Sequence, residues 1–293
     1  MKKNPLFFPI FLIFVLVVLF AAIKGMTESW SFVKPATTPE EIASRYTFPP
    51  TKGPTATPTP KPLTFTEMNS LYGPCTHLPV LMYHHIQPLE SAKEKNQTSL
   101  TVSPEQFRAH LEYLKLRGYN TIYMSDLVNF FDQGTLIPAK SIFITFDDGY
   151  DDFASYALPA LRELGFKATV FVPTGFMDNP GYLSWQTIRE IAQSGDIMFS
   201  NHTWSHRNMG SDKEAIGREI TTADNQLTEK SLNSPKVLAY PYGLESSYAK
   251  EVAESLDYKL AFTTKPGSTQ CKKLRLDLQR IRVGNVDLKN YGF

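Results

Sequence analysis

The sequence predicts an α/β fold in which parallel strands are covered by helices. From Leu78 onward, short apolar runs alternate with longer amphipathic stretches, as in chains built from strand–helix units. Several polar motifs also follow directly after apolar runs, where parallel strands would bring their ends together. Periodicity alone does not choose between an open sheet and a barrel, although a distorted (β/α) barrel follows more naturally.

The expected elements alternate along the chain. Strands are expected at residues 79–83, 119–122, 141–146, 168–172, 196–200, 236–240, 259–263 and 280–283. Helices are expected at residues 103–117, 153–164, 184–194, 212–231 and 246–256.

The first of these helices is the best marked. Ser103 can cap it and Pro104 suits its first position. Gly118 ends it. Phe107 and Leu111 begin an apolar face with helical spacing, so this helix is expected to pack on the strands.

The N-terminus carries a hydrophobic segment. Residues 5–23 form a run of nineteen positions without a charge, about the length that crosses a bilayer. Lys2 and Lys3 precede it, which favours an external position for the rest of the chain. We expect residues 1–24 to be a membrane anchor or a signal, placing the protein in the cell membrane as a single-pass protein with an extracytoplasmic globular domain. If the segment is cleaved, the protein is secreted.

A linker is expected at residues 25–77. Residues 35–62 hold eight Pro and seven Thr, a composition that keeps a chain extended and buries little apolar surface. At about 3 Å per residue the linker would reach roughly 150 Å. Residues 78–293 then form the globular domain.

Charge and cysteine content narrow the classes of protein. The formal net charge of +1 gives no reason to expect a nucleic-acid partner. Cys75 and Cys271 lie near the two ends of the globular part. Outside the cell they can form one disulfide, and the alternative of two free thiols stays open.

Two motifs predict a metal site. Asp147 and Asp148 follow the strand expected at 141–146, and His202 and His206 follow the strand expected at 196–200. One carboxylate and two imidazoles are a common ligand set for a zinc-type ion that keeps a position open for water. The two histidines are four residues apart, so one helical turn would point both rings the same way. The leftover carboxylate can act as a base, which predicts a metal-dependent hydrolase.

These motifs resemble those of one family. The pentad TFDDG, the His-x-x-x-His pair and the later AYPYG occur in the order found in polysaccharide deacetylases, the carbohydrate esterase family 4 or NodB-homology group. The opening PVLMYHHI resembles the branch that deacetylates poly-N-acetylglucosamine. The resemblance covers roughly residues 78–285 and implies a distorted (β/α) barrel of the NodB-homology type.

The resemblance also implies roles for the motif residues. Asp148, His202 and His206 would bind the metal, and Asp147 would be the general base. The backbone N–H of Tyr242 would stabilise the oxyanion. The ion is expected to be divalent, with zinc first and cobalt or nickel as alternatives.

The chain departs from the family pattern at two places. The family often carries an arginine where this chain has Ala239, and no histidine follows His206 to serve as the general acid. His84 is the better candidate for that acid and His85 the other. A further alternative is that Asp147 itself returns the proton.

Aromatic residues predict a sugar-binding surface. Tyr150, Trp185, Pro241 and Tyr242 are the expected substrate contacts, and Trp204 is equally a candidate for the core. The predicted function is metal-dependent removal of N-acetyl groups from poly-N-acetylglucosamine or peptidoglycan, with release of acetate. A catalytically impaired polysaccharide-binding protein and an O-acetyl xylan-type esterase are the alternatives. The expected partners are the N-acetylated polysaccharide and, through the N-terminal helix, the membrane; the sequence does not identify protein partners.

Overall fold

Parallel strands close into a barrel in the part of the chain that the computed structural model describes, residues 62–210 and 212–293. The helices, in chain order, are α3 (Phe65–Tyr72), α4 (Leu89–Glu94), α5 (Pro104–Leu116), α6 (Met124–Gln133), α7 (Leu158–Leu164), α8 (Trp185–Ala192), α9 (Lys213–Glu229) and α10 (Ser247–Ser255). The strands are β1 (Cys75–His77), β2 (Val80–Tyr83), β3 (His85–Ile86), β4 (Thr101–Val102), β5 (Asn120–Thr121), β6 (Ser141–Phe146), β7 (Ala168–Val172), β8 (Ile197–Asn201), β9 (Val237–Ala239), β10 (Leu260–Pro266), β11 (Thr269–Cys271) and β12 (Leu278–Arg282). Short 3₁₀ or π segments are η1 (Thr98–Leu100), η2 (Phe153–Ala157), η3 (Pro241–Gly243), η4 (Lys272–Leu274) and η5 (Leu288–Tyr291).

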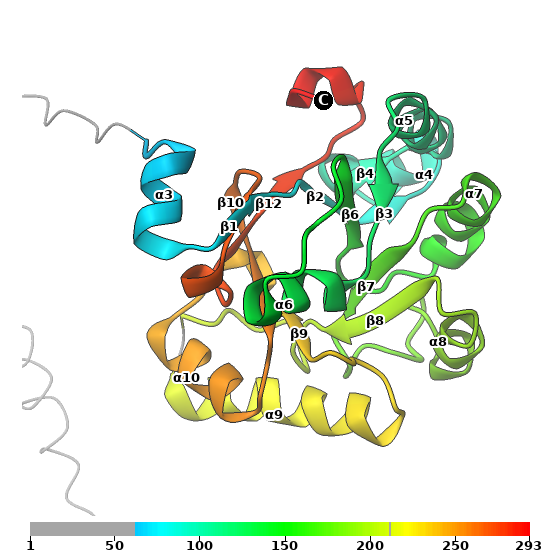
Figure 1. The fold of residues 1–293 in the computed structure, drawn as a ribbon. Helices are drawn as coiled ribbons and strands as arrows, with labels where there is room; N and C mark the ends of the chain where they lie inside the picture. Colours follow the sequence, from blue (N-terminus) through cyan, green and yellow to red (C-terminus); the bar gives the residue numbers. More distant parts are fainter. Residues whose placement is uncertain (1–61, 211) are drawn as a thin grey trace, which may run out of the picture. The chain divides into compact units, whose positions relative to one another are not determined.

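The barrel has seven strands in the order β2-β12-β10-β9-β8-β7-β6, and pairing of β2 with β6 closes it. All of these pairings are parallel, and the short strand β5 pairs with the first residues of β6, also in parallel. Figure 1 shows α5, α7, α8, α9 and α10 around the outside of the strands. The predicted distorted barrel is therefore confirmed.

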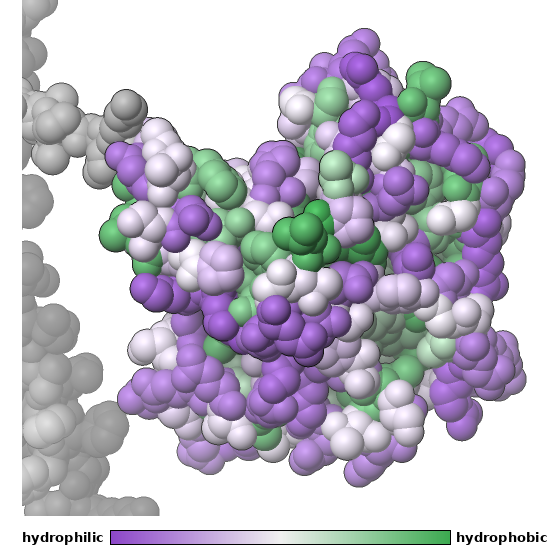
Figure 2. Space-filling view, in the orientation of Figure 1, coloured by the Kyte–Doolittle hydropathy of each residue, from purple (hydrophilic) through white to green (hydrophobic). Residues whose placement is uncertain are grey.

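Alternation along the strands separates the inside of the barrel from the outside. On β6, Ile142 and Ile144 pack with the outer helices, whereas Phe143 belongs to the interior cluster. The interior cluster also contains Phe171 and Phe262 from other strands. Figure 2 shows a face on which hydrophilic residues predominate and apolar residues form small patches. Most large apolar side chains are thus used for packing inside the fold.

Helix α6 was not predicted, and it closes the end of the barrel at which the strands begin. Its buried residues Met124, Leu127 and Phe131 pack in the interior cluster with residues such as Val80 and Leu260, which lie at strand starts. Its N-cap residue is Tyr123 rather than Ser, Thr, Asp or Asn, so the start of the helix is weakly marked in the sequence.

The strands and helices that were predicted from the sequence occur within a few residues of their expected bounds, with one difference in helix type. The helix expected at 153–164 begins as the π-helical segment η2 and continues as α7. A helix and a strand, α3 and β1, also lie in the stretch 25–77 that was assigned to the linker, and the compact unit begins at Pro62. A capping box between Thr64 and Glu67 starts α3.

The predicted anchor, residues 1–24, lies outside the described residues, as does the linker up to residue 61. Among the helices of the described part, none is long and apolar enough to cross a membrane.

A disulfide joins Cys75 to Cys271, partners in the antiparallel pair β1–β11. The sequence left open a disulfide or two free thiols, and the structure contains the disulfide. The bond closes a loop of sequence separation 196. It also secures α3, which has no buried residues of its own.

We expect the double substitution Cys75→Ser/Cys271→Ser to lower the free energy of unfolding by about 5 kcal/mol, the chain-entropy estimate for so long a loop. Urea denaturation of the two proteins under oxidising conditions measures the difference. Reductant should destabilise the wild type and leave the double variant unchanged. Equal unfolding midpoints without reductant would contradict the prediction.

Candidate active site

The acidic pair lies where β6 leaves the barrel. The alternation that points Phe143 inward continues to Asp147, whose residue is only 3% exposed. The backbone N–H of Asp147 donates to the carbonyl of Tyr83 on β2 at 2.9 Å. Asp148 has a positive φ of 73°, so the chain turns sharply between the two carboxylates. The neighbouring aspartates therefore occupy different environments.

Asp148, His202 and His206 bring one carboxylate and two imidazoles together. Oδ1 of Asp148 lies 3.5 Å from Nε2 of His202 and 3.1 Å from Nε2 of His206. One ligand atom from each residue lies within 4.8 Å of the others. Three donors at this spacing fit around one ion with bonds of about 2.0–2.2 Å. The residues predicted as ligands thus meet in an arrangement consistent with a divalent metal site.

The two histidines do not lie on a helix, contrary to the prediction from their spacing. Strand β8 ends at Asn201, and the loop that follows has a positive φ at Thr203 (69°) and at His206 (55°). These left-handed residues fold the chain back, and the rings of His202 and His206 lie 4.9 Å apart between centroids. A spacing of four residues suits a helix and a tight turn equally, so the spacing alone did not distinguish them.

A backbone carbonyl orients the first histidine. Nδ1 of His202 lies 2.7 Å from the carbonyl oxygen of Ala239 and donates to it, which orients the ring so that Nε2 faces Asp148. Ala239 is the position where the resemblance led us to look for an arginine. Burial opposes ionisation of Asp148, but hydrogen bonds from His202 and His206 outweigh it and hold the pKa of that carboxyl well below its usual range.

Arg280 is the residue that the sequence analysis missed. Its guanidinium binds Asp147 in a bidentate pair, with Nη1 to Oδ1 at 2.6 Å and Nη2 to Oδ2 at 2.7 Å. Arg280 is fully buried. Burial alone would raise the pKa of Asp147, but the charge of Arg280 contributes most to outweighing it, so that pKa lies below its ordinary value.

The barrel interior holds this arginine in place. Its Nε donates to the carbonyl of Thr263 at 2.9 Å, and its guanidinium carbon lies 5.7 Å from the centre of the Phe171 ring. On β12 the inward position before it is Leu278, which belongs to the interior cluster. Arg280 lies two residues after Leu278, so both side chains lie on the same face of β12. This alternation was the one feature of the sequence that could have placed an arginine in the barrel interior.

The two candidate acids have different surroundings. His84 follows β2, and the charges of Asp147 and Asp148 act on its ring; burial lowers its pKa, and those charges only partly offset the effect. His85 instead pairs through Nδ1 with Asp152 at 2.5 Å and is 4% exposed. His85 is therefore held by Asp152, whereas His84 is the candidate acid on which the charges of both aspartates act.

The turn η3 places Tyr242 beside the histidines. Tyr242 has a positive φ of 60°, and its ring centroid lies 4.7 Å from that of His206. Within the described residues no acceptor is recorded for its backbone N–H, so this group is available to an oxyanion.

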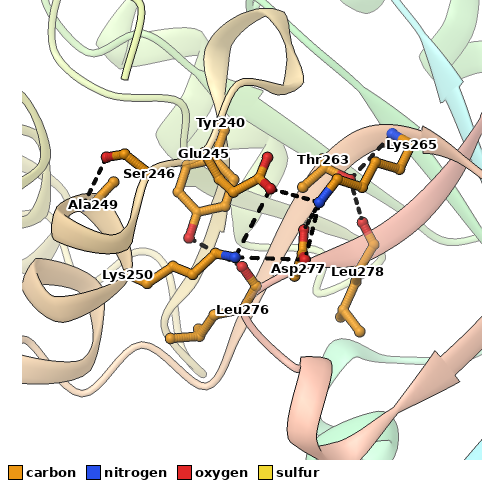
Figure 3. A network of polar contacts seen from close by, with 10 residues as sticks. All are labelled: Tyr240, Glu245, Ser246, Ala249, Lys250, Thr263, Lys265, Leu276, Asp277 and Leu278. Carbon is orange, nitrogen blue, oxygen red and sulfur yellow. Dashed lines mark hydrogen bonds and ion pairs between the residues drawn. The ribbon is translucent and has the colours of Figure 1, made fainter. Parts of the chain in front are cut away.

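A network of charged groups holds the chain that follows this turn (Figure 3). Nζ of Lys265 on β10 lies 2.5 Å from Oε1 of Glu245 and 2.8 Å from Oδ1 of Asp277. Nζ of Lys250 lies 3.5 Å from Oδ2 of Asp277. The network therefore links the segment after η3 to β10, α10 and the start of β12.

Gly243→Ala is expected to disrupt this turn. A Cβ at position 243 would lie 2.0 Å from Oγ1 of Thr264 and 2.4 Å from its backbone nitrogen, at a φ of +69°. We expect a loss of stability of about 1–3 kcal/mol from overpacking, with lower activity and unchanged metal binding. Gly134→Ala is the matched control, because Gly134 has a φ of +73° and no neighbour within 4 Å. Equal losses of stability and activity in the two variants would contradict the prediction.

Tyr242 packs against His206, Tyr150 lies near Asp148, and Trp204 belongs to the loop between His202 and His206. Tyr242 is 62% exposed and Trp204 is 45% exposed. Trp204 packs closely against Gly175, where an added Cβ would lie 2.6 Å from the indole nitrogen. Tyr150 stacks on the His85 ring at 3.5 Å, and Asp148 contacts its hydroxyl. Pro241, which begins η3, is buried.

Trp185 has other partners. Its backbone N–H donates to Asp178, and Nζ of Lys230 lies 4.5 Å from its ring centroid. Lys230 lies just past the end of α9. The contacts recorded for Trp185 therefore do not join it to the metal ligands.

The chain is similar in sequence to known polysaccharide deacetylases. Residues 137–261 match the sequence profile of a family described as polysaccharide deacetylase. YxkH of Bacillus subtilis is 29% identical over 207 residues, covering 70% of this chain and 71% of YxkH. The poly-beta-1,6-N-acetyl-D-glucosamine N-deacetylase of Escherichia coli K12 is 23% identical, and the match covers 67% of this chain but 36% of that protein. The chain thus spans about a third of that relative's length.

Solved structures show the same fold. The Streptococcus pyogenes deacetylase PplD in complex with acetate superimposes with a TM-score of 0.67 at 29% identity, over 73% of this chain and 96% of PplD. A polysaccharide deacetylase from Bacillus cereus gives a TM-score of 0.66 at 25% identity, over 74% and 68% of the two chains.

Proposed function

Because this chain belongs to the polysaccharide deacetylase family, we propose that it removes N-acetyl groups from a polysaccharide that contains N-acetylglucosamine. The reaction is hydrolysis of the amide, which releases acetate and leaves a free amine on the sugar. The observation that carries the proposal is the cluster of Asp148, His202 and His206 beside the pair of Asp147 and Arg280.

The chain supplies a ligand set and a base. Asp148, His202 and His206 would hold a divalent ion, with zinc first and cobalt or nickel as alternatives. Such an ion supplies Lewis acidity, which makes water more nucleophilic and polarises the amide carbonyl. Asp147 takes the proton from the attacking water. Arg280 fixes the orientation of Asp147 and keeps it ionised, as a base must be.

Two further groups complete the reaction. The backbone N–H of Tyr242 donates to the amide oxygen as negative charge develops on it. His84 gives a proton to the leaving amine. Because burial lowers its pKa, the ring has to take up that proton first, and the charges of both aspartates favour the uptake. Return of the proton from Asp147 is the alternative for that last step.

The substrate class rests on the relatives and on the exposed rings. Relatives from Escherichia coli and Staphylococcus aureus, 23% identical, are named as poly-beta-1,6-N-acetyl-D-glucosamine N-deacetylases. Tyr242 and Trp204 offer exposed faces on which sugar rings can stack. We therefore propose poly-N-acetylglucosamine or peptidoglycan glycan as the polymer, and a membrane-attached, extracytoplasmic protein that reaches it through the linker.

Two alternative functions are a polysaccharide-binding protein without turnover and an O-acetyl xylan-type esterase. A sugar-binding protein without turnover is suggested by the missing arginine at Ala239 and by the missing histidine after His206. Arg280 answers the first point, because it supplies a guanidinium to the base from another strand. An O-acetyl xylan-type esterase would use the same groups on a different substrate. Both stand as outcomes of the test below.

The test is acetate release by the full chain from poly-N-acetylglucosamine, peptidoglycan and O-acetylated xylan. The assay is run with added zinc, cobalt or nickel and with a chelator, and bound metal is counted. Chelator-sensitive release from an N-acetylated polymer is expected. Release only from xylan would make the protein an esterase, and saturable polymer binding without release would make it a binding protein.

A further inference from the structure

We propose that Glu219 is a positioning residue that builds the second half of the metal site by holding the loop between His202 and His206. The inference rests on the proposed metal-dependent function and extends it to a residue outside the three motifs. Glu219 lies on α9, and it is 5% exposed. None of the ion pairs recorded among the described residues includes it, so its carboxylate has another use.

That use is the loop of the second histidine. Oε2 of Glu219 accepts hydrogen bonds from the backbone N–H of Ser205 at 2.7 Å and of Trp204 at 3.1 Å. Oε1 accepts one from Oγ of Ser205 at 2.5 Å. One buried carboxylate thus binds two successive peptide N–H groups and a hydroxyl immediately before His206.

The loop needs such a partner because its backbone is strained. Thr203 is β-branched and has a φ of 69°, and His206 has a φ of 55°; both conformations are unfavourable for these residues. On the other side of the loop, the carbonyls of Thr203 and Trp204 accept from the N–H groups of Thr174 and Gly175 at 3.0 and 2.7 Å. The loop is therefore held between the chain after β7 and α9.

Removing the Glu219 carboxylate would break the contacts of the loop with α9 and leave those with the chain after β7. The N–H groups of Trp204 and Ser205 would lose their recorded acceptor, and the peptides between Thr203 and His206 could rotate to relieve the positive φ angles. His206 would then move from Asp148, whereas His202 would stay, because the carbonyl of Ala239 orients its ring. A site with one ligand displaced binds a metal more weakly and in a different geometry.

The experiment measures cobalt(II) binding rather than turnover. Affinity is determined by competition with a chromophoric chelator, and the visible absorption of bound cobalt reports its coordination geometry. For Glu219→Leu we expect an affinity about 10–100-fold lower and an altered absorption spectrum. Glu219→Gln keeps an oxygen acceptor for the N–H groups, and its amide can donate to Ser205, so it should restore most of the affinity and the wild-type spectrum.

The matched controls are Asp224→Leu and Asp224→Asn on the same helix. Asp224 is also buried, but it pairs with Lys236 at 2.7 Å and has no recorded contact with the loop. These variants should bind cobalt as the wild type does, even where the helix is destabilised.

The proposal is overturned if Glu219→Leu binds cobalt with wild-type affinity and spectrum, or if Asp224→Leu weakens binding equally. Should Glu219→Leu fail to fold, Glu219→Gln with Ser205→Ala decides. That pair removes the charge and the hydroxyl contact but keeps an acceptor for the two N–H groups, so we expect weaker cobalt binding than in the wild type, with a smaller loss than in His206→Ala. Wild-type affinity and spectrum in that pair would overturn the proposal. A wild-type chain that binds no cobalt would overturn the metal site itself, which is a separate and recognisable result.

Discussion

Asp147→Asn is expected to lower acetate release by about 10²–10⁴-fold, the range over which a general base contributes. The substitution keeps the shape of the side chain but removes its ability to take a proton from water. Asp148, His202 and His206 are untouched, so bound metal should stay at the wild-type level. The measurement is kcat/KM on the preferred polymer together with metal content.

Asp151→Asn is the control for this variant. Asp151 lies four residues further along and is exposed, so its substitution should leave kcat/KM close to that of the wild type. Unfolding curves of both variants show whether the loss reflects chemistry or folding. Asp147→Asn with wild-type turnover and bound metal would exclude Asp147 as the base.

Arg280→Met is expected to lower the free energy of unfolding by about 3–5 kcal/mol, because it leaves the carboxylate of Asp147 buried without a partner. Arg280 is fully buried, and its pair with Asp147 is bidentate at 2.6 and 2.7 Å. Urea denaturation at neutral pH measures the loss. Arg282→Met is the control, because Arg282 lies on the same strand but is exposed.

The same variant should change the response to pH. In the wild type, Arg280 contributes most to outweighing burial and depressing the pKa of Asp147. A depressed folded-state pKa adds stability that is present above the unfolded value of about 3.9 and is lost as the pH falls through the folded value. Without Arg280, burial raises the pKa, so the acidic limb of both stability and activity should move to higher pH. Coincident profiles for the variant and the wild type would contradict this coupling.

A double variant tests whether the two residues act as a pair. In Asp147→Asn/Arg280→Met neither ionised group remains in the barrel interior. Its stability should exceed that predicted by adding the losses of the two single variants, since each single variant leaves one buried charge unpaired. Strict additivity would mean that the contact contributes little.

The sequence by itself determined most of the alternating strands and helices of the barrel and the three candidate ligands. The elements and the candidate ligands can both be recognised from patterns within short stretches of the sequence. The alternation of apolar and polar residues marks the ends of strands such as β6 and β8, and parallel strands place those ends on one face of a barrel. Asp148, His202 and His206 could therefore be expected to meet, as they do.

Only the tertiary structure decided which residues surround those ligands. Asp147 and Arg280 are 133 positions apart, and their contact exists because β2 pairs with both β6 and β12 when the barrel closes. Glu219 likewise reaches the histidine loop only after α9 packs beside β8. A residue's local pattern fixes the face of the strand or helix on which it lies. Its partner across the fold depends on closure and register, which no short stretch of sequence encodes.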